Sequence, residues 1–532
     1  MFEDRALLGL FPAQIPESVR PEDYPATLLV DGRVRQPASR DRWLPVYSRV
    51  GVREGDSVQP IVVGYQADIG PAEAAEAIDA AERAWDGGCG AWPSAPLDKR
   101  IACIEQFAAR LAELAERIAI VLMFEIGKPL AAAKSEVSRS LEYIRATVAE
   151  MRRIGVHGSL YSGSTGTSTH YARDVLYPLG KVLCVAPFNY PINEFLTTIV
   201  PALLAGNVVI AKTPRFGVLA NQLLAPAFAE CFPPGVVALL PGDGRAVLPA
   251  LMAAKSVDVL GNPKGAIDVL AFIGSEQAAN AILTAHPTPS FVHKILGLGA
   301  KNAGIVLPGA DVKAVAGKLV KGALGFNGQR CTAEKIVFAP EGGEGDALAA
   351  AIGEKVAALP VGMPWDKDVA ITPLPEHHKV ETMWAYLEDA LDKGAHLVNE
   401  TGGRGAFSLM RPAVVDGVAE GMKLCHEEQF GPIVPIARYE SLDDVITWHR
   451  RSPYGQQAGV HGPHDASLVR QLAAFVARVN INDVCQRGPD TFGFTAADKS
   501  GFGTLSIEAA LRSFSRAVIV QSQSSGDLSN YG

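Results

Sequence analysis

The sequence predicts an α/β protein made of two doubly wound α/β domains and a small β flap. Apolar runs of strand length alternate with helical patterns over residues 182–273, and a second alternation covers about 300–500. A polar segment rich in Gly, Ser and Thr at 155–177 precedes them, and a short apolar strand lies near the C-terminus. A chain of 532 residues has room for roughly two to four such domains.

Composition excludes several classes of protein. The net charge of -8 gives no general attraction for nucleic acid or anionic membranes. Seven scattered cysteines without CxxC spacing indicate neither a disulfide framework nor a metal site. Glu3 and Asp4 stand where a signal peptide needs a basic start, and the most apolar segment, 195–210, is too short to span a bilayer. We therefore expect a cytoplasmic protein with neither nucleic-acid nor membrane partners.

The first 150 residues predict an arm followed by helices. Residues 1–40 are rich in Pro and Arg, with one hairpin signal at 28–34 around Asp31-Gly32. Apolar residues then recur at helical spacing. The predicted helices cover 71–85, 97–121 and 131–154, with Gly127-Lys128-Pro129 ending the second.

The pattern changes at residue 155. Polar residues alternate through 155–177, which predicts an exposed β-hairpin, although a flexible surface loop would have a similar composition. An apolar run, 517–520, inside the segment 513–521 predicts a strand that pairs within the chain or across a subunit interface.

Between these two features lie the two alternating regions. In parallel sheets ligands bind at the carboxyl ends of strands, so 187–190, 212–215 and 274–275 are candidate lining segments. No GxGxxG motif is present. The expected strands are 181–186, 207–212, 236–240, 269–273, 303–307 and 335–339, and the expected helices are 195–205, 219–232, 245–254, 312–325, 345–359 and 377–393.

Cys331 is the candidate nucleophile. It follows a predicted turn, 325–329, that contains two glycines, and it is adjacent to Arg330 in the sequence. A thiolate is the reactive form of cysteine, and a neighbouring guanidinium lowers the free energy of forming it. The alternative is a small buried apolar residue at the start of a strand.

Five motifs occur together in order: Pro187-Phe188-Asn189-Tyr190-Pro191, Ala211-Lys212-Thr213-Pro214-Arg215, Phe272-Ile273-Gly274-Ser275, Gly328-Gln329-Arg330-Cys331-Thr332 and Glu427-Glu428-Gln429-Phe430-Gly431-Pro432. With these motifs the chain resembles the aldehyde dehydrogenase superfamily over residues 24–521. Tyr190, Arg330, Arg139 and Arg487 make it most similar to the non-phosphorylating, NADP-dependent glyceraldehyde-3-phosphate dehydrogenases.

The resemblance implies a division of the chain. A Rossmann-like cofactor-binding domain covers 24–154 and 179–298, and a catalytic domain with the nucleophilic cysteine covers 299–505. Residues 1–23 form an N-terminal arm. The hairpin 155–178 and the C-terminal segment 506–532 resemble elements that join subunits, which implies a homodimer or homotetramer.

The resemblance also implies the catalytic roles. Cys331 would form a thioester with the substrate, and the Asn189 amide with the Cys331 N–H would stabilise the oxyanion. Arg139, Tyr190, Arg330 and Arg487 would hold the phosphate of a small aldehyde, because guanidinium groups match phosphate oxygens.

The cofactor roles follow in the same way. Lys212 would bind the adenosine ribose, Gly274 and Ser275 would meet the pyrophosphate at a helix start, and Glu428 and Phe430 would fix the nicotinamide half. Arg215 stands where relatives that prefer NAD often place a glutamate. An arginine there can pair with a 2′-phosphate, so the sequence favours NADP over NAD.

One position departs from the family. The glutamate that activates water to hydrolyse the thioester is replaced by Gly297 in Gly297-Leu298-Gly299-Ala300-Lys301. Losing such a base slows that step by about 10² to 10⁴. His293 or Glu428 can be considered as substitutes. Otherwise the acyl group passes to an acceptor such as coenzyme A or phosphate, or the protein turns over slowly or not at all.

The predicted function is NADP-dependent oxidation of a small phosphorylated aldehyde, glyceraldehyde 3-phosphate to 3-phosphoglycerate, through a Cys331 thioester. A coenzyme A-dependent acylating dehydrogenase and an inactive cofactor-binding relative are the alternatives.

Overall fold

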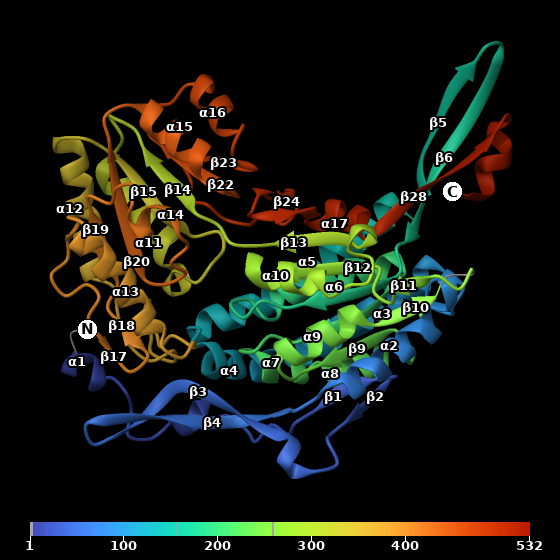
Figure 1. Cartoon of the computed structure of the whole chain (residues 1–532), viewed down its shortest axis with the longest axis horizontal. Helices are drawn as coiled ribbons and strands as arrows, with labels where there is room; N and C mark the ends of the chain where they lie inside the picture. Colours follow the sequence, from blue (N-terminus) through green and yellow to red (C-terminus); the bar gives the residue numbers. More distant parts are fainter. Residues whose placement is uncertain (1–3, 156, 258–259, 532) are drawn as a thin grey trace.

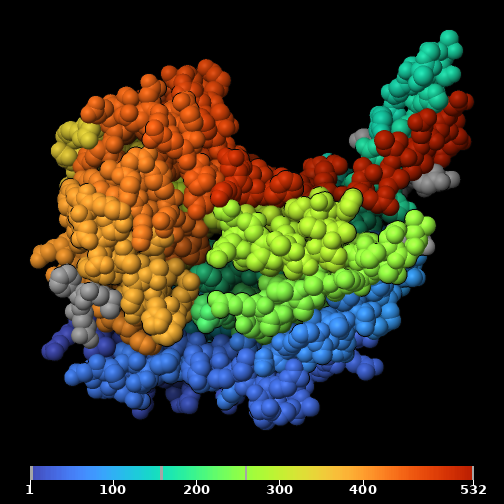
Figure 2. Space-filling model, in the orientation of Figure 1, coloured from blue at the N-terminus to red at the C-terminus, as the bar shows by residue number. Residues whose placement is uncertain are grey.

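Two α/β lobes and a projecting β flap form the molecule, seen in a computed structural model that describes residues 4–155, 157–257 and 260–531 (Figure 1). The predicted fold class is confirmed. In Figure 2 the flap, made of residues near 157–178 and the C-terminal strand, stands clear of both lobes.

The first lobe contains an eight-stranded sheet in the order β2-β1-β9-β8-β7-β12-β13-β26. Its centre, from β9 to β13, is parallel, and the strand order reverses between β7 and β12. This reversal creates the crevice where α/β sheets bind ligands. The strands are β1 (Leu28–Val30), β2 (Arg33–Arg35), β7 (Lys181–Val185), β8 (Val208–Lys212), β9 (Val237–Leu240), β12 (Val269–Ile273), β13 (His293–Gly297) and β26 (Gly501–Phe502).

Helices cover both faces of this sheet. On one side α5 packs against α3, α4 and α6, and on the other α2 packs against α9. The helix α6 is buried along its whole length. The helices are α2 (Pro71–Trp85), α3 (Leu97–Glu113), α4 (Ala115–Ile126), α5 (Leu130–Ile154), α6 (Asn193–Ala205), α7 (Val218–Gln222), α8 (Ala225–Cys231), α9 (Gly244–Ala253) and α10 (Glu276–Thr284), with a small hairpin of β10 (Lys255–Val257) and β11 (Pro263–Gly265).

Two predicted helices are each divided in the structure. The run 97–121 is interrupted at Leu114, where half-exposed α3 gives way to the largely buried α4, which continues to Ile126. The run 219–232 is interrupted near Leu223, because Pro226 has no N–H for a hydrogen bond to the preceding turn.

A long hairpin that the sequence analysis did not predict joins the two lobes. It consists of β3 (Trp43–Glu54) and β4 (Ser57–Ala67), and it lies below both lobes in Figure 1. The Arg49 carbonyl accepts a hydrogen bond from Ser408 Oγ at 2.6 Å. The Arg49 guanidinium lies 4.3 Å from the Phe407 ring centroid. The hairpin therefore bridges segments almost 360 residues apart.

The N-terminal arm is also tied to the second lobe. It contains α1 (Arg5–Leu8) and a 3-10 turn, Glu17–Val19, in place of a fully extended chain. Asp4 pairs with Arg411 at 2.5 Å, and the Asp4 N–H donates to the Gly405 carbonyl at 3.1 Å. These contacts account for an arm that the sequence left unexplained.

The second lobe holds a seven-stranded sheet ordered β16-β19-β20-β15-β14-β22-β23, parallel except at β16. Its elements are β14 (Asn302–Val306), α11 (Val312–Leu324), β15 (Glu334–Pro340), α12 (Gly343–Ala357), α13 (Lys379–Asp392), β16 (His396–Leu397), β19 (Ala413–Asp416), α14 (Lys423–His426), β20 (Ile433–Tyr439), α15 (Leu442–Arg451), β22 (Gln457–His461), α16 (Ala466–Leu472) and β23 (Arg478–Ile481). Two-residue strands form small pairs beside it: β17 (Gly405–Ala406) with β18 (Leu409–Met410), β21 (Tyr454–Gly455) with β25 (Ala497–Asp498), and β24 (Phe494–Thr495) with β27 (Thr504–Leu505).

The flap confirms the predicted hairpin and terminal strand. Strands β5 (His157–Thr165) and β6 (Ser168–Pro178) pair with β28 (Ser515–Ser522), which follows α17 (Ile507–Ser513). The domain limits remain predictions. Strand β26 pairs with β13, so part of the segment assigned to the catalytic domain completes the first sheet.

Glu125 provides a test of how the first lobe is held together. This carboxylate is 2% exposed on α4. It accepts the N–H groups of Gly217, Leu219 and Ala220 at 3.0–3.1 Å, around the start of α7. We expect Glu125→Ala to lower the free energy of unfolding by about 3 kcal/mol or more, because three buried donors lose their acceptor.

Urea denaturation at fixed protein concentration measures this loss. Glu116→Ala on the exposed face of α4 is the control, since its pair with Lys134 is solvated and contributes about 1 kcal/mol at most. Equal midpoints for the two variants would contradict the expectation.

Candidate active site

One cavity of about 1080 Å³ lies where the two lobes meet, at the carboxyl ends of β7, β8, β12 and β13. The segments predicted from strand ends all line it. So do all thirteen candidate site residues: Arg139, Asn189, Tyr190, Lys212, Arg215, Gly274, Ser275, Gly297, Arg330, Cys331, Glu428, Phe430 and Arg487.

The loop that carries Cys331 is held in one conformation. Phe326 and Asn327 adopt positive φ, and Gly328 has φ +71°. A Cβ on Gly328 would lie 2.5 Å from the Gly431 carbonyl oxygen, so glycine is required there. The Asn302 amide donates to the Cys331 carbonyl at 2.8 Å. The thiol is therefore presented by a backbone fixed on both sides.

Burial dominates the electrostatics of the thiol. It raises the pKa of Cys331, while Lys335 and Arg330 act against that rise and Glu428 adds to it. The sequence suggested Arg330 as the main aid to ionisation, but the larger effect is desolvation. Without cofactor or substrate, Cys331 is mostly a neutral thiol at pH 7.

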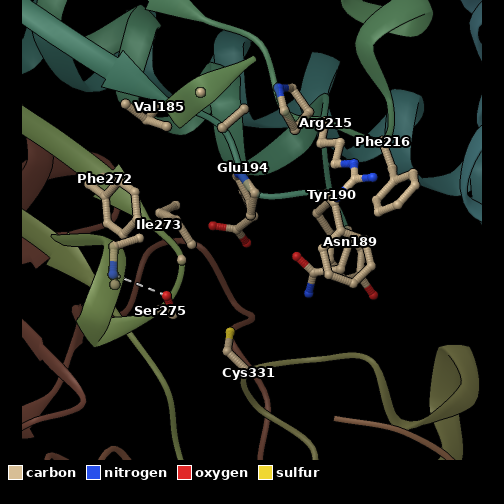
Figure 3. Close-up of a pocket in the computed structure, with 18 of the residues that line it drawn as sticks. Val185, Asn189, Tyr190, Glu194, Arg215, Phe216, Phe272, Ile273, Ser275 and Cys331 are labelled. Atoms are coloured by element: carbon tan, nitrogen blue, oxygen red, sulfur yellow. Dashed lines mark hydrogen bonds between the residues drawn. The ribbon is translucent and has the colours of Figure 1, made fainter. Parts of the chain in front are cut away.

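Asn189 reaches across from the first lobe. Its side-chain amide donates to the Gln329 carbonyl at 2.8 Å, two residues before the thiol. The main-chain carbonyl of Asn189 accepts a hydrogen bond from Lys128 Nζ at 2.8 Å. An amide nitrogen has two hydrogens, so the second can serve an oxyanion beside Cys331. Figure 3 shows the Asn189 amide and the Cys331 sulfur facing the same open space.

A buried ion pair that the sequence analysis did not single out holds this turn. Lys128 is 1% exposed and pairs with Glu136, which is 3% exposed. Glu136 accepts the N–H groups of Ile192 and Asn193 at 3.0 and 3.1 Å. Lys128 Nζ also lies 3.8 Å from the ring centroid of Tyr190. In the sequence, Lys128 is recognisable only as part of Gly127-Lys128-Pro129, the segment predicted to end a helix.

The three arginines of the predicted anion site differ in their partners. Arg139 makes two hydrogen bonds to Asp490, at 2.9 and 3.2 Å. Arg487 pairs with Glu194 and lies 3.6 Å from Asp490. Arg330 donates to the Gly322 carbonyl at 2.5 Å, and no ion pair joins it to a carboxylate among the described residues. Two carboxylates against three guanidiniums leave one formal positive charge.

The cofactor half of the cavity fits a dinucleotide. Lys212 is 2% exposed, and burial lowers its pKa to about 8. Its Nζ donates to the Thr213 carbonyl at 2.7 Å. A Cβ on Gly274 would lie 2.6 Å from the Phe272 ring, so this position does not accommodate a side chain. The backbone at Gly274 is therefore not covered by a side chain of its own. Ser275 Oγ accepts the Ala278 N–H at 3.2 Å and caps α10, leaving a helix start open towards the cavity.

The segment 427–430 is held in place by contacts of its residues with Lys301, Ala300 and Lys335. Lys301 is buried, with its pKa lowered by burial to about 7. It donates to the Glu427 carbonyl at 2.7 Å and to Gln429 Oε1 at 2.8 Å. Glu428 accepts from the Ala300 N–H at 3.2 Å and pairs with Lys335 at 3.1 Å. Its charge is therefore already engaged.

Gly297 ends strand β13 inside the cavity. An added Cβ would meet Ile273 at 3.4 and 3.6 Å, which are ordinary van der Waals distances, so packing alone does not require glycine at this position. The suggestion that His293 supplies the base is wrong. His293 begins the same strand, opposite Val269, and four extended residues separate it from Gly297 by about 13 Å.

Several cavity residues escaped the sequence analysis. Glu194 lies in the first turn of α6, a buried helix that carries no other charged residue, and that isolated charge was the available signal. Arg245 follows Gly242-Asp243-Gly244, which has only the first two glycines of a GxGxxG motif and so gave no signal in the sequence. Leu44 and Gln66 come from the hairpin that was not predicted. Glu376 and Lys379 form a pair at 2.8 Å beside Phe430.

In the described part of the chain, no group of three or more His, Cys, Asp or Glu side chains is arranged to hold a metal ion. None of the helices in that part is both long and apolar enough to cross a membrane.

Comparisons with known proteins agree on one family. The sequence profile described as "Aldehyde dehydrogenase family" matches residues 52–520. The chain is 34% identical over 432 residues to an NADP-dependent glyceraldehyde-3-phosphate dehydrogenase of Streptococcus equinus, covering 79% of this chain and 86% of that protein. It is 29% identical to a 3-sulfolactaldehyde dehydrogenase of Priestia aryabhattai, over 73% of this chain and 78% of the relative.

The fold comparison is equally extensive. The crystal structure of an NADP-dependent glyceraldehyde-3-phosphate dehydrogenase from Bacillus halodurans C-125, complexed with NADP, superposes with a TM-score of 0.82 at 30% identity. The match covers 94% of this chain and 99% of that one.

The raised pKa of Cys331 predicts slow alkylation at neutral pH. Because only the thiolate reacts, the rate of labelling by iodoacetamide is expected to rise about tenfold per pH unit, and to keep rising above pH 9. Mass spectrometry of the Cys331 peptide measures the rate, with Cys331→Ser as the background. A plateau below pH 8 would show that the thiol is already ionised.

Proposed function

The chain belongs to the aldehyde dehydrogenase family, and we propose that it oxidises a small anionic aldehyde to its acid, using NADP and a Cys331 thioester. The observation that carries the proposal is the single cavity in which Cys331, Asn189, the arginine cluster and the cofactor-binding segments meet. Each of the residue roles described here is part of the proposal.

NADP would be held along the crevice where the strand order reverses. Lys212 would bind the adenosine ribose, and Arg215, with Arg245 nearby in the cavity wall, would meet the 2′-phosphate. The bare backbone at Gly274 and the start of α10 would receive the pyrophosphate. Glu428 and Phe430 would hold the nicotinamide half. When bound, NADP supplies the hydride acceptor.

Cys331 would attack the aldehyde carbonyl as a thiolate. The developing oxyanion would be stabilised by the Asn189 amide and the Cys331 N–H. Lys335 and Arg330 favour the thiolate, since both lower the pKa that burial raises. The Lys128–Glu136 pair keeps the Asn189 turn in place throughout, so the donor needs no rearrangement as charge develops.

Glyceraldehyde 3-phosphate is the first substrate to test, because Arg139, Tyr190, Arg330 and Arg487 surround the cavity beyond the thiol. Glu194 and Asp490 reduce the positive charge of this cluster to one. A monoanionic aldehyde such as 3-sulfolactaldehyde, the substrate in the name of one relative, is therefore the second.

Gly297 favours a second candidate, acyl transfer to coenzyme A. A glycine has no group that can deprotonate water, and an acceptor that brings its own thiol needs no such base. This alternative predicts turnover that depends on added coenzyme A.

The flap and the domain limits complete the proposal. Strand β28 leaves one edge of the flap open, and such an edge can pair with another chain. We assign the hairpin 155–178 and the segment 506–532 to a homodimer or homotetramer interface.

A burst experiment tests the central claim. Mixing the enzyme with NADP and glyceraldehyde 3-phosphate is expected to give a stoichiometric burst of NADPH followed by slower turnover, because Cys331 reacts before the thioester is released. Gly297→Glu should raise the steady-state rate by roughly 10- to 100-fold without changing the burst amplitude.

Neither burst nor turnover, with either aldehyde, would exclude the proposed reaction. A steady state that needs coenzyme A would instead support the acyl-transfer alternative. Cys331→Ser serves as the control that abolishes the burst.

Arg215 provides a test of cofactor choice. Arg215→Ala should weaken NADP binding roughly 10- to 100-fold, since a charge-assisted contact to phosphate is lost, while NAD binding stays unchanged. Fluorescence titration with both cofactors measures the two affinities. An equal loss for NADP and NAD would show that Arg215 supports the fold of the site in place of reading the 2′-phosphate.

A further inference from the structure

The cavity lacks the glutamate that the family resemblance leads us to expect at position 297, but it contains another carboxylate, Glu194, for which the proposed function gives no catalytic role. Gly297 stands where a water-activating glutamate is expected, while Glu194 lines the same cavity from the first turn of α6. Building on the proposed function, we propose that Glu194 is the general base that hydrolyses the Cys331 thioester.

Glu194 is placed close to the catalytic groups by short backbone links. Its N–H donates to the Tyr190 carbonyl at 3.1 Å, so it lies one turn after Asn189. The Asn189 amide in turn contacts Gln329, two residues from Cys331. Figure 3 shows the Glu194 carboxylate pointing into the open part of the cavity that Cys331 and Asn189 also face.

Glu194 lies on the buried helix α6, beside the guanidinium of Arg487. The remaining residues of α6 are buried and mostly hydrophobic, and Glu194 itself is 9% exposed. A charge at such a position is costly unless it is paired. Its Oε2 is held by Arg487, whereas no partner of Oε1 occurs among the hydrogen bonds of the described residues. One oxygen is thus fixed and the other faces the cavity.

Three other acidic residues line the cavity, and each is already engaged. Asp243 caps α9 through the Arg245 N–H at 3.0 Å. Glu376 pairs with Lys379 at 2.8 Å. Glu428 holds Lys335 and the Ala300 N–H, on the side assigned to the nicotinamide. Glu194 is also paired, through Oε2 to Arg487, and what distinguishes it is its position one turn after Asn189, with the carboxylate directed into the open part of the cavity that Cys331 faces.

The proposed step balances without a further reactant. A water oxygen forms a bond to the thioester carbonyl carbon while one of its protons passes to Glu194 Oε1. The oxyanion of the adduct is stabilised by the Asn189 amide. Collapse breaks the C–S bond, returns Cys331 as a thiolate and releases the acid, and Glu194 then gives its proton to solvent. No electron acceptor takes part.

The pair with Arg487 explains why this base would be slow. A guanidinium partner favours the charged form of a carboxylate and so weakens it as a base. Arg487 is also assigned to the substrate anion. An anion bound there competes for the guanidinium, which makes Glu194 a stronger base when the acyl group is in place.

Glu194→Gln tests the proposal because glutamine keeps the shape and can still accept from Arg487. We expect the NADPH burst to keep its amplitude, the steady-state rate to fall roughly 100-fold, and the acylated Cys331 peptide to accumulate in acid-quenched samples analysed by mass spectrometry. The double variant Glu194→Gln with Gly297→Glu should recover the rate of Gly297→Glu alone.

Asp490→Asn is the matched control. Asp490 also pairs with the arginines but is absent from the cavity wall. Its replacement should change the KM for the anionic aldehyde. Because Asp490 and Glu194 share Arg487, the lifetime of the acyl-enzyme should change too, but far less than in Glu194→Gln and without accumulation of the acylated Cys331 peptide.

Several results would overturn the proposal. An unchanged steady state in Glu194→Gln would exclude Glu194 as the base. A lost burst, or a slow steady state that Gly297→Glu does not restore, would show that Glu194 only supports Arg487 and the pocket.

An assay without NADP distinguishes failure of this proposal from failure of the proposed function. p-Nitrophenyl acetate acylates a reactive thiol directly and releases p-nitrophenolate, so deacylation can be followed even if no aldehyde gives a burst. Slower deacylation in Glu194→Gln than in wild type is expected, and equal rates would refute the role of Glu194 whatever the natural aldehyde is.

Discussion

The buried pair between Lys128 and Glu136 is the interaction on which the candidate site depends. It is formed between two charges that are almost fully removed from water, and both make further hydrogen bonds to the turn that carries Asn189. A buried pair of this kind is stable only when its remaining donors and acceptors are satisfied. The turn therefore cannot move without leaving a charge unpaired, and the Asn189 amide stays beside the loop that holds Cys331.

A second constraint is the charge of the anion pocket. Arg139 and Arg487 share the carboxylates Asp490 and Glu194, whereas Arg330 forms no ion pair with either of them among the described residues. Burial lowers the pKa of Arg487 to about 10, so its charge needs a partner. The carboxylates stabilise the arginines in the free protein, and they also limit how much negative charge a substrate can bring. Glu194 would connect this balance to the fate of the proposed thioester, because the same side chain lines the cavity that contains Cys331.

Much of the fold could be predicted because its strands are buried and its helices are amphipathic. The strands near 182, 208, 237 and 269 were identified from continuous apolar runs, and their alternation with helices predicted a doubly wound sheet, whereas the strand order came only from the structure. The hairpin β3–β4 was missed because its exposed faces dilute the apolar pattern. The helix breaks at Leu114 and Leu223 were missed because helical spacing continues across them, and tertiary packing decides where a helix ends.

The sequence by itself determined which chemical groups this protein offers: a cysteine beside an arginine, an asparagine before a buried helix, several arginines, and a glycine at the end of strand β13. These depend only on residue type and order along the chain. Only the tertiary structure decided which charges meet. Glu194 and Arg487 are 293 residues apart, and no local pattern predicts that they pair, because such contacts arise from the packing of two lobes. The same packing excluded His293, which an extended strand carries away from Gly297, and brought Glu194 to the cavity that contains Cys331.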